Sequence, residues 1–331
     1  MVRLGLIGCG RIGRVHADSI DVHPRAELAH VYDPLEVAAR EVGTPFGAPW
    51  GTDVNAVIDD PSIDAVVVAS PTPTHVDLLT RAVRAGKAVL CEKPIDLDLA
   101  RVDACRAEIG ALADRVMVGF NRRFDPSFRN IRERVAAGEI GALEQLVIIS
   151  RDPAPPPAAY LATSGGLFRD MTIHDFDMAR YFLGEVVEVT ATGANLVSGE
   201  VAAAGDIDGA VVVLRGASGA LCSITNSRRC AFGHDQRLEA FGELGMLTAA
   251  NQLPNSVRFS GAAQTEVAPP YYHFFLDRYT PAYRAEMDHF VTAVETGSTP
   301  SPGFSDGRAA LALADAANES LRTGTTAKVG A

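Results

Sequence analysis

The first 120 residues alternate short apolar runs with segments in which apolar residues recur at helical spacing. Runs that are apolar on both faces indicate buried strands, and helices between them indicate a parallel sheet covered on each side. We therefore predict a doubly wound α/β domain. Its strands are expected at 4–7, 28–32, 65–68, 88–90 and 116–118.

Beyond residue 122 the pattern changes, and strand candidates follow one another with few helices between them. Such a run favours a mostly antiparallel sheet and a second domain of α+β type. The Ala/Leu-rich stretch 305–323 predicts a final helix, with Ser305 as its N-cap and Gly324 just past its end. The strands of this second domain are expected at 143–149, 187–196, 209–214, 220–226 and 236–241.

These two patterns divide the chain into two predicted domains. Residues 1–121 are expected to form a Rossmann domain that binds a dinucleotide. Residues 122–331 are expected to form an α+β domain for substrate binding and oligomerisation, with a C-terminal helix able to pack back on the first domain.

Composition narrows the function classes. The chain has 331 residues and a net charge of −11, which disfavours nucleic acid or an anionic membrane surface as a partner. No apolar run approaches the ~20 residues of a membrane span, and no signal-peptide pattern precedes the first strand. The cysteines are odd in number and lack a C-x-x-C pair, so we expect buried free thiols and a cytoplasmic protein. They are Cys9, Cys91, Cys105, Cys222 and Cys230.

A glycine motif, Gly8-x-Gly10-x-x-Gly13, follows the first strand and opens a helix. Such glycines let the backbone approach a pyrophosphate at the helix N-terminus. Asp33 ends the second strand 20 residues after Gly13, where an acid accepts from a ribose 2′-hydroxyl and repels a 2′-phosphate. A turn used only for packing is the alternative; strand, helix and acid together favour NAD. The predicted cofactor contacts here are Gly8, Gly10, Arg11, Ile12, Gly13 and Asp33.

Further cofactor contacts are expected where later strands end, because the carboxyl ends of strands border the ligand crevice of a doubly wound sheet. Lys93 follows one such strand and is expected to direct a cation toward the nicotinamide or the substrate. A surface lysine paired with Glu92 is the alternative. His75 begins a helix and is expected to act as a cap or a ribose contact. The contacts predicted from these loops are Thr72, His75, Glu92 and Lys93.

The segment 165–184, taken as a helix with about 100° per residue, places four polar residues within a stripe about 60° wide. They are Asp170, His174, Asp177 and Tyr181. A histidine and carboxylates among apolar residues are costly unless they are hydrogen-bonded or functional, so His174 is a candidate general base. A structural histidine with a capping aspartate is one alternative. A metal pair is another, but no third ligand has suitable spacing, and we predict no metal.

Together these motifs resemble the Gfo/Idh/MocA oxidoreductases, named for glucose–fructose oxidoreductase and inositol dehydrogenase. The resemblance covers almost the whole chain. Its strongest part is His75-x6-Ala82-x3-Gly86-Lys87-x-Val89-x2-Glu92-Lys93-Pro94, joined by the Gly8 motif and Asp170-x3-His174. Other segments look like the inositol 2-dehydrogenase branch: Ser150-Arg151-Asp152-Pro153, Gly165–Gly184, and Asn226-Ser227-Arg228-Arg229 with Asp235-Gln236-Arg237.

The resemblance implies an NAD-dependent dehydrogenase that oxidises a polyol, expected to be myo-inositol, to 2-keto-myo-inositol (scyllo-inosose). It implies Lys93, Asp170 and His174 as the catalytic set. We expect His174 to be the base and Lys93 to stabilise the charge of the developing alkoxide. Asp170 is expected to orient the imidazole of His174 or to hold a neighbouring hydroxyl. The family resemblance also implies a homo-tetramer. Its polyol pocket would be lined by Arg123, Asp152, His174 and His234.

Departures and alternatives keep the exact substrate open. Thr72 stands where the family often has Asn, and His234 where this branch often has Tyr. One of Arg122 and Arg123 is expected in a hinge ion pair and the other at the substrate. Another sugar dehydrogenase, a redox-neutral glycosidase that uses tightly held NAD, and a non-catalytic NAD-binding regulator are the other classes. The intact catalytic set argues against the regulator, and net NADH formation from polyol alone separates dehydrogenase from glycosidase.

Overall fold

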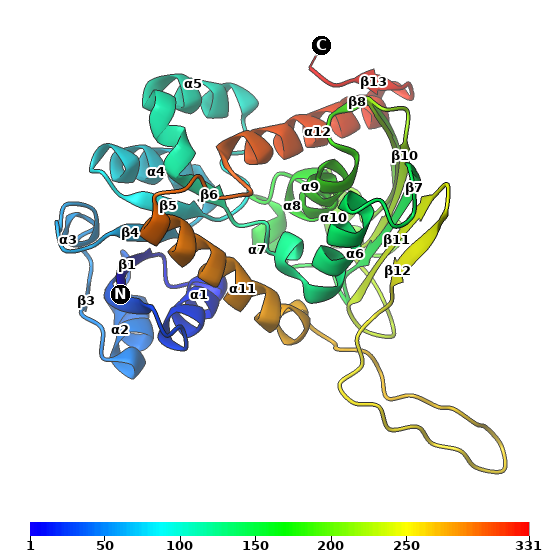
Figure 1. The fold of residues 1–331 in the computed structure, drawn as a ribbon, viewed down its shortest axis with the longest axis horizontal. Coiled ribbons are helices and arrows are strands. Elements are labelled where there is room, and N and C mark those ends of the chain that lie inside the picture. Colours follow the sequence, from blue (N-terminus) through cyan, green and yellow to red (C-terminus); the bar gives the residue numbers. More distant parts are fainter. Residues whose placement is uncertain (331) are drawn as a thin grey trace. The chain divides into compact units, whose positions relative to one another are not determined.

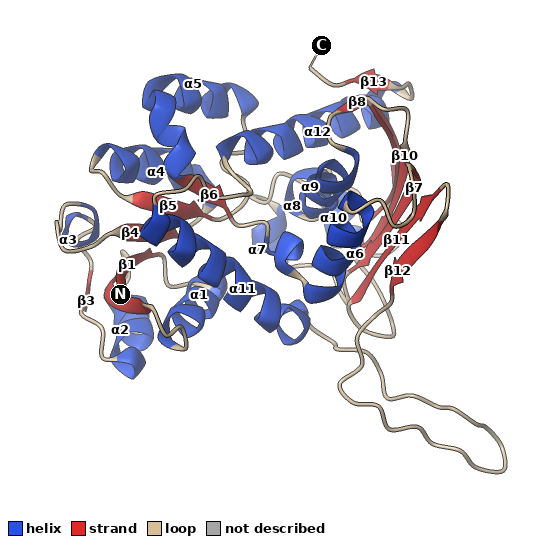
Figure 2. Ribbon diagram, viewed as in Figure 1, coloured by secondary structure: helices blue, strands red, loops and turns tan. Residues whose placement is uncertain are grey.

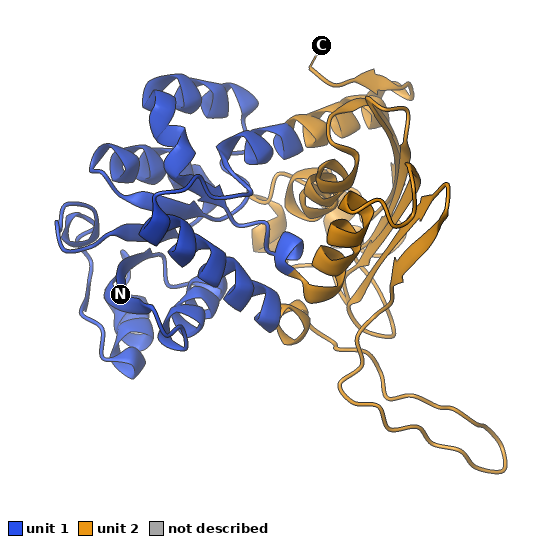
Figure 3. Cartoon of the chain, in the orientation of Figure 1, with its two compact units in different colours: residues 1–124, 280–311 blue, residues 125–279, 312–331 orange. Residues whose placement is uncertain are grey.

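A computed structural model describes residues 1–330 (Figure 1). The chain divides into two compact units, and each is built from two segments of the sequence (Figure 3). Unit 1 contains Met1–Phe124 and Thr280–Leu311, and unit 2 contains Asp125–Tyr279 and Ala312–Ala331. Unit 1 therefore takes in a segment that lies far along the chain from its Rossmann-like part.

The sheet of unit 1 has six strands in the order β3-β2-β1-β4-β5-β6, and every pair in it is parallel. Helices lie on both sides of it, with α4 and α5 on one side and α1 and α2 on the other (Figure 2). The predicted doubly wound α/β domain is confirmed. Only β3 escaped prediction, because a two-residue strand carries no apolar run. The strands are β1 Val2–Ile7, β2 Ala26–Tyr32, β3 Trp50–Gly51, β4 Ala65–Val68, β5 Ala88–Cys91 and β6 Val116–Val118.

The helices of unit 1 include one that the sequence pattern missed. This is α11, Phe275–Thr296, which joins unit 1 from Thr280 onward and contains Pro281 near its beginning. A proline inside a helical pattern normally indicates a break, which hides such a helix. The other helices are α1 Arg11–Asp21, α2 Glu36–Gly43, α3 Asn55–Ile58, α4 His75–Arg84 and α5 Leu99–Ile109, with 3-10 turns η1 Thr44–Phe46, η2 Thr72–Thr74, η3 Gly110–Arg115 and η4 Asn121–Phe124.

The final helix, α12, spans Phe304–Thr323. The predicted N-cap at Ser305 is wrong, because Ser305 already lies inside the first turn. Asp306 supplies the cap instead: its Oδ2 accepts a hydrogen bond from the Gly303 N–H at 2.9 Å. Gly324 follows the helix with φ +68°, as predicted for a residue just past the C-terminus.

The sheet of unit 2 has seven strands in the order β12-β11-β7-β10-β9-β8-β13. Only the β7–β10 pair is parallel, which confirms the mostly antiparallel sheet. The short β12 and β13 were not predicted. The strands are β7 Leu143–Arg151, β8 Val186–Ala194, β9 Gly209–Gly216, β10 Leu221–Ser227, β11 Asp235–Gly242, β12 Gly245–Ala249 and β13 Ala327–Lys328.

Helices cover one face of this sheet (Figure 2). Residues 250–274 instead form a long loop that projects from the unit, with one isolated bridge between Phe259 and Val267 (Figure 1). The helix core includes Phe168 and Phe176, whose ring centroids are 6.3 Å apart. The helices are α6 Pro126–Ala136, α7 Ala158–Leu161, α8 Leu167–Asp170, α9 Thr172–Leu183 and α10 Gly199–Ala203.

Two further sequence expectations concern the whole described chain. All five cysteines are free and buried, which confirms the prediction of free thiols. Burial raises the pKa of each thiol, to about 12 for Cys9, where the Asp33 carboxylate adds to the effect. Within residues 1–330, no helix is both long enough and apolar enough to cross a bilayer.

Candidate active site

The glycine motif of unit 1 forms a turn that only glycine permits at two of its three positions. Gly8 has φ +102°, and a Cβ there would lie 2.6 Å from the Ser70 N. A Cβ on Gly13 would lie 2.0 Å from the Gly8 carbonyl oxygen. A Cβ on Gly10, in contrast, would meet no atom within 4 Å, so the outer edge of the turn is open.

Asp33 is fixed beside this turn. Its Oδ2 accepts from the Cys9 N–H at 2.9 Å, and its Oδ1 accepts from the Leu35 N–H at 2.9 Å. The first turn of α1 contains no acidic residue, so the partial positive charge of its N-terminus is left for an anion. An open glycine edge, a helix N-terminus and a fixed carboxylate fit the pyrophosphate and ribose of NAD.

Lys93 lies half-buried in the loop after β5. Its N–H donates to Glu92 Oε2 at 3.2 Å, and Glu92 Oε1 is 2.8 Å from His16 Nε2. This hydrogen bond comes from the backbone of Lys93, so it does not test the sequence alternative of a surface lysine whose side chain pairs with Glu92. The buried Glu92–His16 pair anchors the loop that carries the lysine.

His75 supports the same loop from the other side. It is almost fully buried, with Nδ1 2.8 Å from the Pro94 carbonyl oxygen and Nε2 2.7 Å from the Ser70 carbonyl oxygen. His75 therefore ties the loop after β4 to the loop after β5. Its predicted contact with the cofactor remains a prediction, as does that of Thr72, which begins the neighbouring η2 turn.

Arg123 belongs to the η4 turn of unit 1 and is buried. Its Nη2 is 3.0 Å from Asp306 Oδ1, and its Nη1 donates to Ser301 Oγ at 3.5 Å. Asp306 also caps α12, so this ion pair joins η4 to the beginning of that helix. The predicted role of Arg123 at the polyol is not tested by these contacts.

Glu286, on α11, is a titratable residue of unit 1 that the sequence pattern did not single out. It is fully buried, and its two carboxylate oxygens have no hydrogen-bond partner among the described residues. Burial, together with the negative charge of Glu92, raises its pKa well above the usual value. Folding therefore favours the protonated form of Glu286.

We expect Glu286→Gln to stabilise the protein more at pH 8 than at pH 5. The unfolded chain releases this proton near the ordinary glutamate pKa of 4.5, whereas the folded chain keeps it. Stability therefore falls as the pH rises above that value, by about 1.4 kcal/mol per pH unit until the folded-state pKa is reached. The amide removes this slope. Thermal melting of the natural chain and the variant at pH 5 and pH 8 measures this effect. The prediction is contradicted if the two proteins differ in melting temperature by the same amount at both pH values.

Asp170 and His174 lie in unit 2, on consecutive helices. Asp170 ends α8 and His174 lies in the first turn of α9, so the single helix predicted across 165–184 is wrong. The helices are separated at Met171, whose carbonyl oxygen accepts from the His174 N–H at 3.3 Å, three residues along rather than four. Asp177 is buried further along α9.

The carboxylate of Asp170 is held by two donors. Tyr160 donates from its hydroxyl to Oδ1 at 2.7 Å, and Arg228 donates from Nη1 to Oδ2 at 3.0 Å. Arg228 is fully buried and follows β10. It belongs to a segment that stood out in the sequence, but nothing there assigned it a role.

A buried hydrogen-bond network fixes the helix that carries His174. Asp175 Oδ2 accepts from Asn226 Nδ2 at 2.7 Å, and Thr172 Oγ1 donates to Asn226 Oδ1 at 2.8 Å. Both Thr172 and Asp175 belong to the first turn of α9, and Asn226 belongs to β10. The network therefore holds the turn around His174 against the sheet.

Asp152 and His234 are brought together in unit 2. Asp152 follows β7 and donates its backbone N–H to the Ser227 carbonyl oxygen at 2.9 Å. Its Oδ1 is 3.4 Å from Nδ1 of His234, which lies just before β11. His234 is buried, with its ring edge-on to Tyr279 at 5.8 Å between centroids. The two predicted pocket residues therefore form one cluster.

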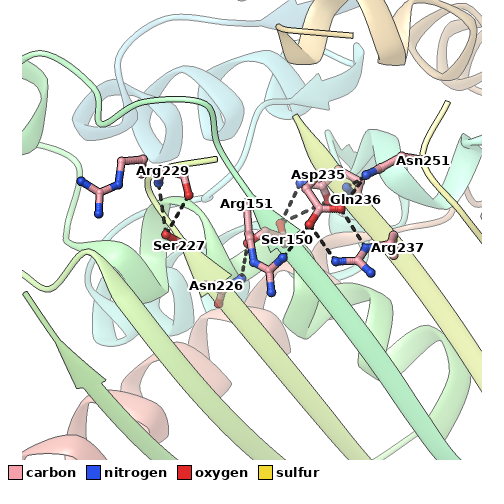
Figure 4. Close-up of polar contacts among 9 residues, drawn as sticks. All are labelled: Ser150, Arg151, Asn226, Ser227, Arg229, Asp235, Gln236, Arg237 and Asn251. Atoms are coloured by element: carbon pink, nitrogen blue, oxygen red, sulfur yellow. Dashed lines mark hydrogen bonds and ion pairs between the residues drawn. The ribbon is translucent and has the colours of Figure 1, made fainter. Parts of the chain in front are cut away.

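A second polar cluster supports these strand ends (Figure 4). Asp235 is fully buried and accepts hydrogen bonds from Arg151 at 2.8 Å and from Asn251 at 2.5 Å. Arg237 donates to both of its carboxylate oxygens, at 2.9 and 3.0 Å. Asp235 thus joins the end of β7 to the beginning of β11, next to the Asp152–His234 contact. Ser150 and Gln236 form a side-chain pair beside it.

The predicted site residues thus fall into two groups, each described within its own unit. Unit 1 holds the glycine turn, Asp33, Thr72, His75, Glu92, Lys93 and Arg123, and unit 2 holds Asp152, Asp170, His174 and His234. Within residues 1–330, no cluster of three or more His, Cys, Asp or Glu side chains suits a metal ion.

Comparison with known proteins covers almost the whole chain. The oxidoreductase family model with the NAD-binding Rossmann fold, GFO/IDH/MocA, matches residues 2–120, and the GFO/IDH/MocA C-terminal domain matches residues 128–248. The chain is 48% identical to the inositol 2-dehydrogenase of Rhizobium meliloti, over 97% of each chain.

Solved structures agree with these matches. The crystal structure of a myo-inositol dehydrogenase from Corynebacterium glutamicum has a TM-score of 0.98 and 53% identity, covering 100% of this chain and 99% of that one. The scyllo-inositol dehydrogenase from Lactobacillus casei, with bound NAD(H) and scyllo-inositol, has a TM-score of 0.92 and 28% identity, covering 100% of both chains.

Proposed function

We propose that this chain, which belongs to the Gfo/Idh/MocA family of oxidoreductases, oxidises myo-inositol at its 2-hydroxyl to 2-keto-myo-inositol (scyllo-inosose). It is an NAD-dependent dehydrogenase that acts on CH–OH groups. The observation that carries the choice of substrate is the near-full-length identity of 48% to a protein named inositol 2-dehydrogenase. The polar cluster of Asp152 and His234 supports a substrate with many hydroxyls.

The reaction removes a proton from the hydroxyl oxygen and a hydride from the carbon that bears it. NAD, when bound, accepts the hydride. We assign His174 as the general base that takes the proton, and Lys93 as the cation that stabilises negative charge developing on the oxygen. Asp170 orients the imidazole or holds a neighbouring hydroxyl.

The two units divide this work in the proposal. Unit 1 holds NAD through the open glycine edge, the N-terminus of α1 and Asp33, whose carboxylate accepts from the ribose 2′-hydroxyl and repels a 2′-phosphate. Unit 2 provides the base, His174, and two proposed polyol contacts, Asp152 and His234. The remaining proposed polyol contact, Arg123, belongs to unit 1. The cofactor residues that complete the proposal are Gly8, Gly10, Arg11, Ile12, Gly13, Thr72, His75, Glu92 and Lys93.

A substrate panel tests this function. Purified protein is mixed with NAD or NADP and with myo-inositol, scyllo-inositol, glucose or xylose, and formation of the reduced cofactor is followed. We expect net NADH with myo-inositol and a kcat/KM at least about tenfold lower for the two sugars, since unmatched hydroxyl contacts are costly. Absence of net NADH with every polyol would favour a redox-neutral reaction. Activity only with NADP would overturn the role of Asp33.

We also propose that the protein acts as a homo-tetramer in the cytoplasm. By the strand register, five exposed apolar residues share the uncovered face of the unit 2 sheet, and this supports association between copies. Its free buried thiols suit a reducing compartment. Light scattering measures the oligomeric state, and cell fractionation measures the location. The apolar residues are Val211, Val213, Leu221, Phe241 and Met246.

A further inference from the structure

Among the described residues whose exposed fraction is below 2%, Arg228 has the largest side chain. It lies beside the proposed catalytic residue Asp170. Its Nη1 is 3.0 Å from Asp170 Oδ2, and its Nη2 is 3.7 Å from Asp206 Oδ2. A guanidinium stays charged in proteins, and a buried charge needs counter-charges close to it. The two aspartates supply them.

Asp206 connects this arginine to the beginning of α8. Its Oδ1 accepts from the Leu167 N–H at 2.9 Å, and a Cβ on Gly166 would lie 3.0 Å from the same oxygen. Gly166 also has φ +86°, which favours glycine. Asp206 therefore holds the first N–H of α8, while Arg228 holds the carboxylate at its last residue. The two ends of this four-residue helix are tied to one guanidinium.

Tyr160 fixes the remaining oxygen of the same carboxylate. Its hydroxyl donates to Asp170 Oδ1 at 2.7 Å, whereas Arg228 donates to Oδ2. Two donors on different oxygens determine the plane of the carboxylate as well as its position. The Asp170 side chain is only 12% exposed, so the guanidinium also replaces part of the contact with water that the carboxylate loses there.

We propose that Arg228 is a positioning residue of the dehydrogenase, which holds the carboxylate of Asp170 in its working orientation together with Tyr160. The inference rests on the role of Asp170 in the proposed function. It assigns two residues that do not need to touch the substrate themselves. Their effect on turnover passes through Asp170.

The test is a set of double-mutant cycles. Arg228→Gln, Arg228→Lys and Tyr160→Phe are made in the natural chain and in the Asp170→Asn variant, and kcat and KM for polyol are measured. We expect Arg228→Gln to lower kcat up to about 100-fold, as misplacement of a reacting group can. Lysine keeps the charge without the fork and should recover part of that loss. In the Asp170→Asn background these substitutions should change kcat less than about twofold, because they act through the missing carboxylate.

Arg229→Gln is the matched control. Arg229 is adjacent in sequence but exposed, and its side chain donates only a long 3.4 Å hydrogen bond to the Leu196 carbonyl oxygen in unit 2. We expect unchanged kcat and KM for it. NAD binding and thermal melting of each variant show whether it is folded. If Arg228→Gln does not fold, the Tyr160→Phe cycle decides, because that residue is 48% exposed and loses only a hydroxyl.

The outcomes separate this inference from the proposed function. Wild-type turnover in Asp170→Asn would remove the assigned role of Asp170, and this inference with it. Suppose instead that Asp170→Asn is slow, and that Arg228→Gln or Tyr160→Phe lowers its kcat by the same factor as in the natural chain. That result would overturn the positioning role and leave the role of Asp170 intact. The positioning role is supported if Arg228→Gln and Tyr160→Phe lower kcat only in the chain that still has Asp170.

Discussion

His174→Ala is expected to lower kcat by about 10²–10⁴-fold, the contribution of one positioned general base. The hydroxyl proton must leave as the hydride leaves the carbon, and alanine accepts no proton. His174 belongs to unit 2, whereas the glycine turn and Asp33 belong to unit 1. The variant should therefore bind NAD with the natural affinity, which calorimetry of the cofactor measures separately from turnover.

Two further variants identify the cause of that loss. His174→Gln keeps much of the volume and a hydrogen-bonding group but no base, so it should be about as slow as the alanine variant. His273→Ala removes an exposed histidine of the same unit and should leave kcat unchanged. Near-normal turnover in His174→Ala would show that His174 is not the general base, and Asp170 would then be the next residue to test.

The sheet of unit 1 could be predicted because its signal is local. Residues 65–68 are all apolar and all fully buried, and a short β-branched run between helices has few other interpretations. The glycine turn and Asp33 were predicted for the same reason, since their spacing along the chain determines their positions in a Rossmann fold. The observed backbone angle of Gly8 and the Cβ contacts at Gly8 and Gly13 explain why glycine is needed at these two positions.

The partners of the site residues could not be predicted in this way, because they come from distant segments. Asp170 and Arg228 are 58 residues apart, and Glu286 joins unit 1 from α11, whose proline hides the helix. One signal was available for Arg228. Inward-facing residues alternate along β10, and continuing that alternation past the end of the strand places Arg228 inside and Arg229 outside.

The break between α8 and α9 shows where helical periodicity misleads. The 100° count placed Asp170 and His174 on one stripe, yet the backbone leaves the regular ladder at Met171. Both residues are polar and close in sequence, so the pattern looked regular. Which donors hold Asp170 depends on Tyr160 and Arg228, and neither position is set by the period of a helix.

Lys93→Met is expected to lower kcat by about 10²–10³-fold, comparable to the loss of one group that stabilises developing negative charge. Only three of the thirty Lys and Arg residues are lysines, so the chain places arginine almost everywhere a cation is needed. A compact ammonium delivers its charge to a single oxygen, whereas a guanidinium is broad and planar. Lys93→Arg should therefore recover little of the activity.

Lys87→Met is the matched control for this substitution. Lys87 lies at the other end of β5 and donates from Nζ to the carbonyl oxygens of Asp60 and Ile63. Its loss leaves the buried Ile63 carbonyl oxygen without this donor, whereas the Asp60 carbonyl oxygen still accepts from the Ile63 N–H at 3.2 Å. The substitution should cost about 1–3 kcal/mol of stability, seen as a lower melting temperature, with kcat unchanged. Lys93→Met should show the reverse pattern: a nearly natural melting temperature and a collapsed kcat. If Lys93→Met keeps its kcat, the alkoxide charge is stabilised by another group, and the proposed catalytic set reduces to the residues of unit 2.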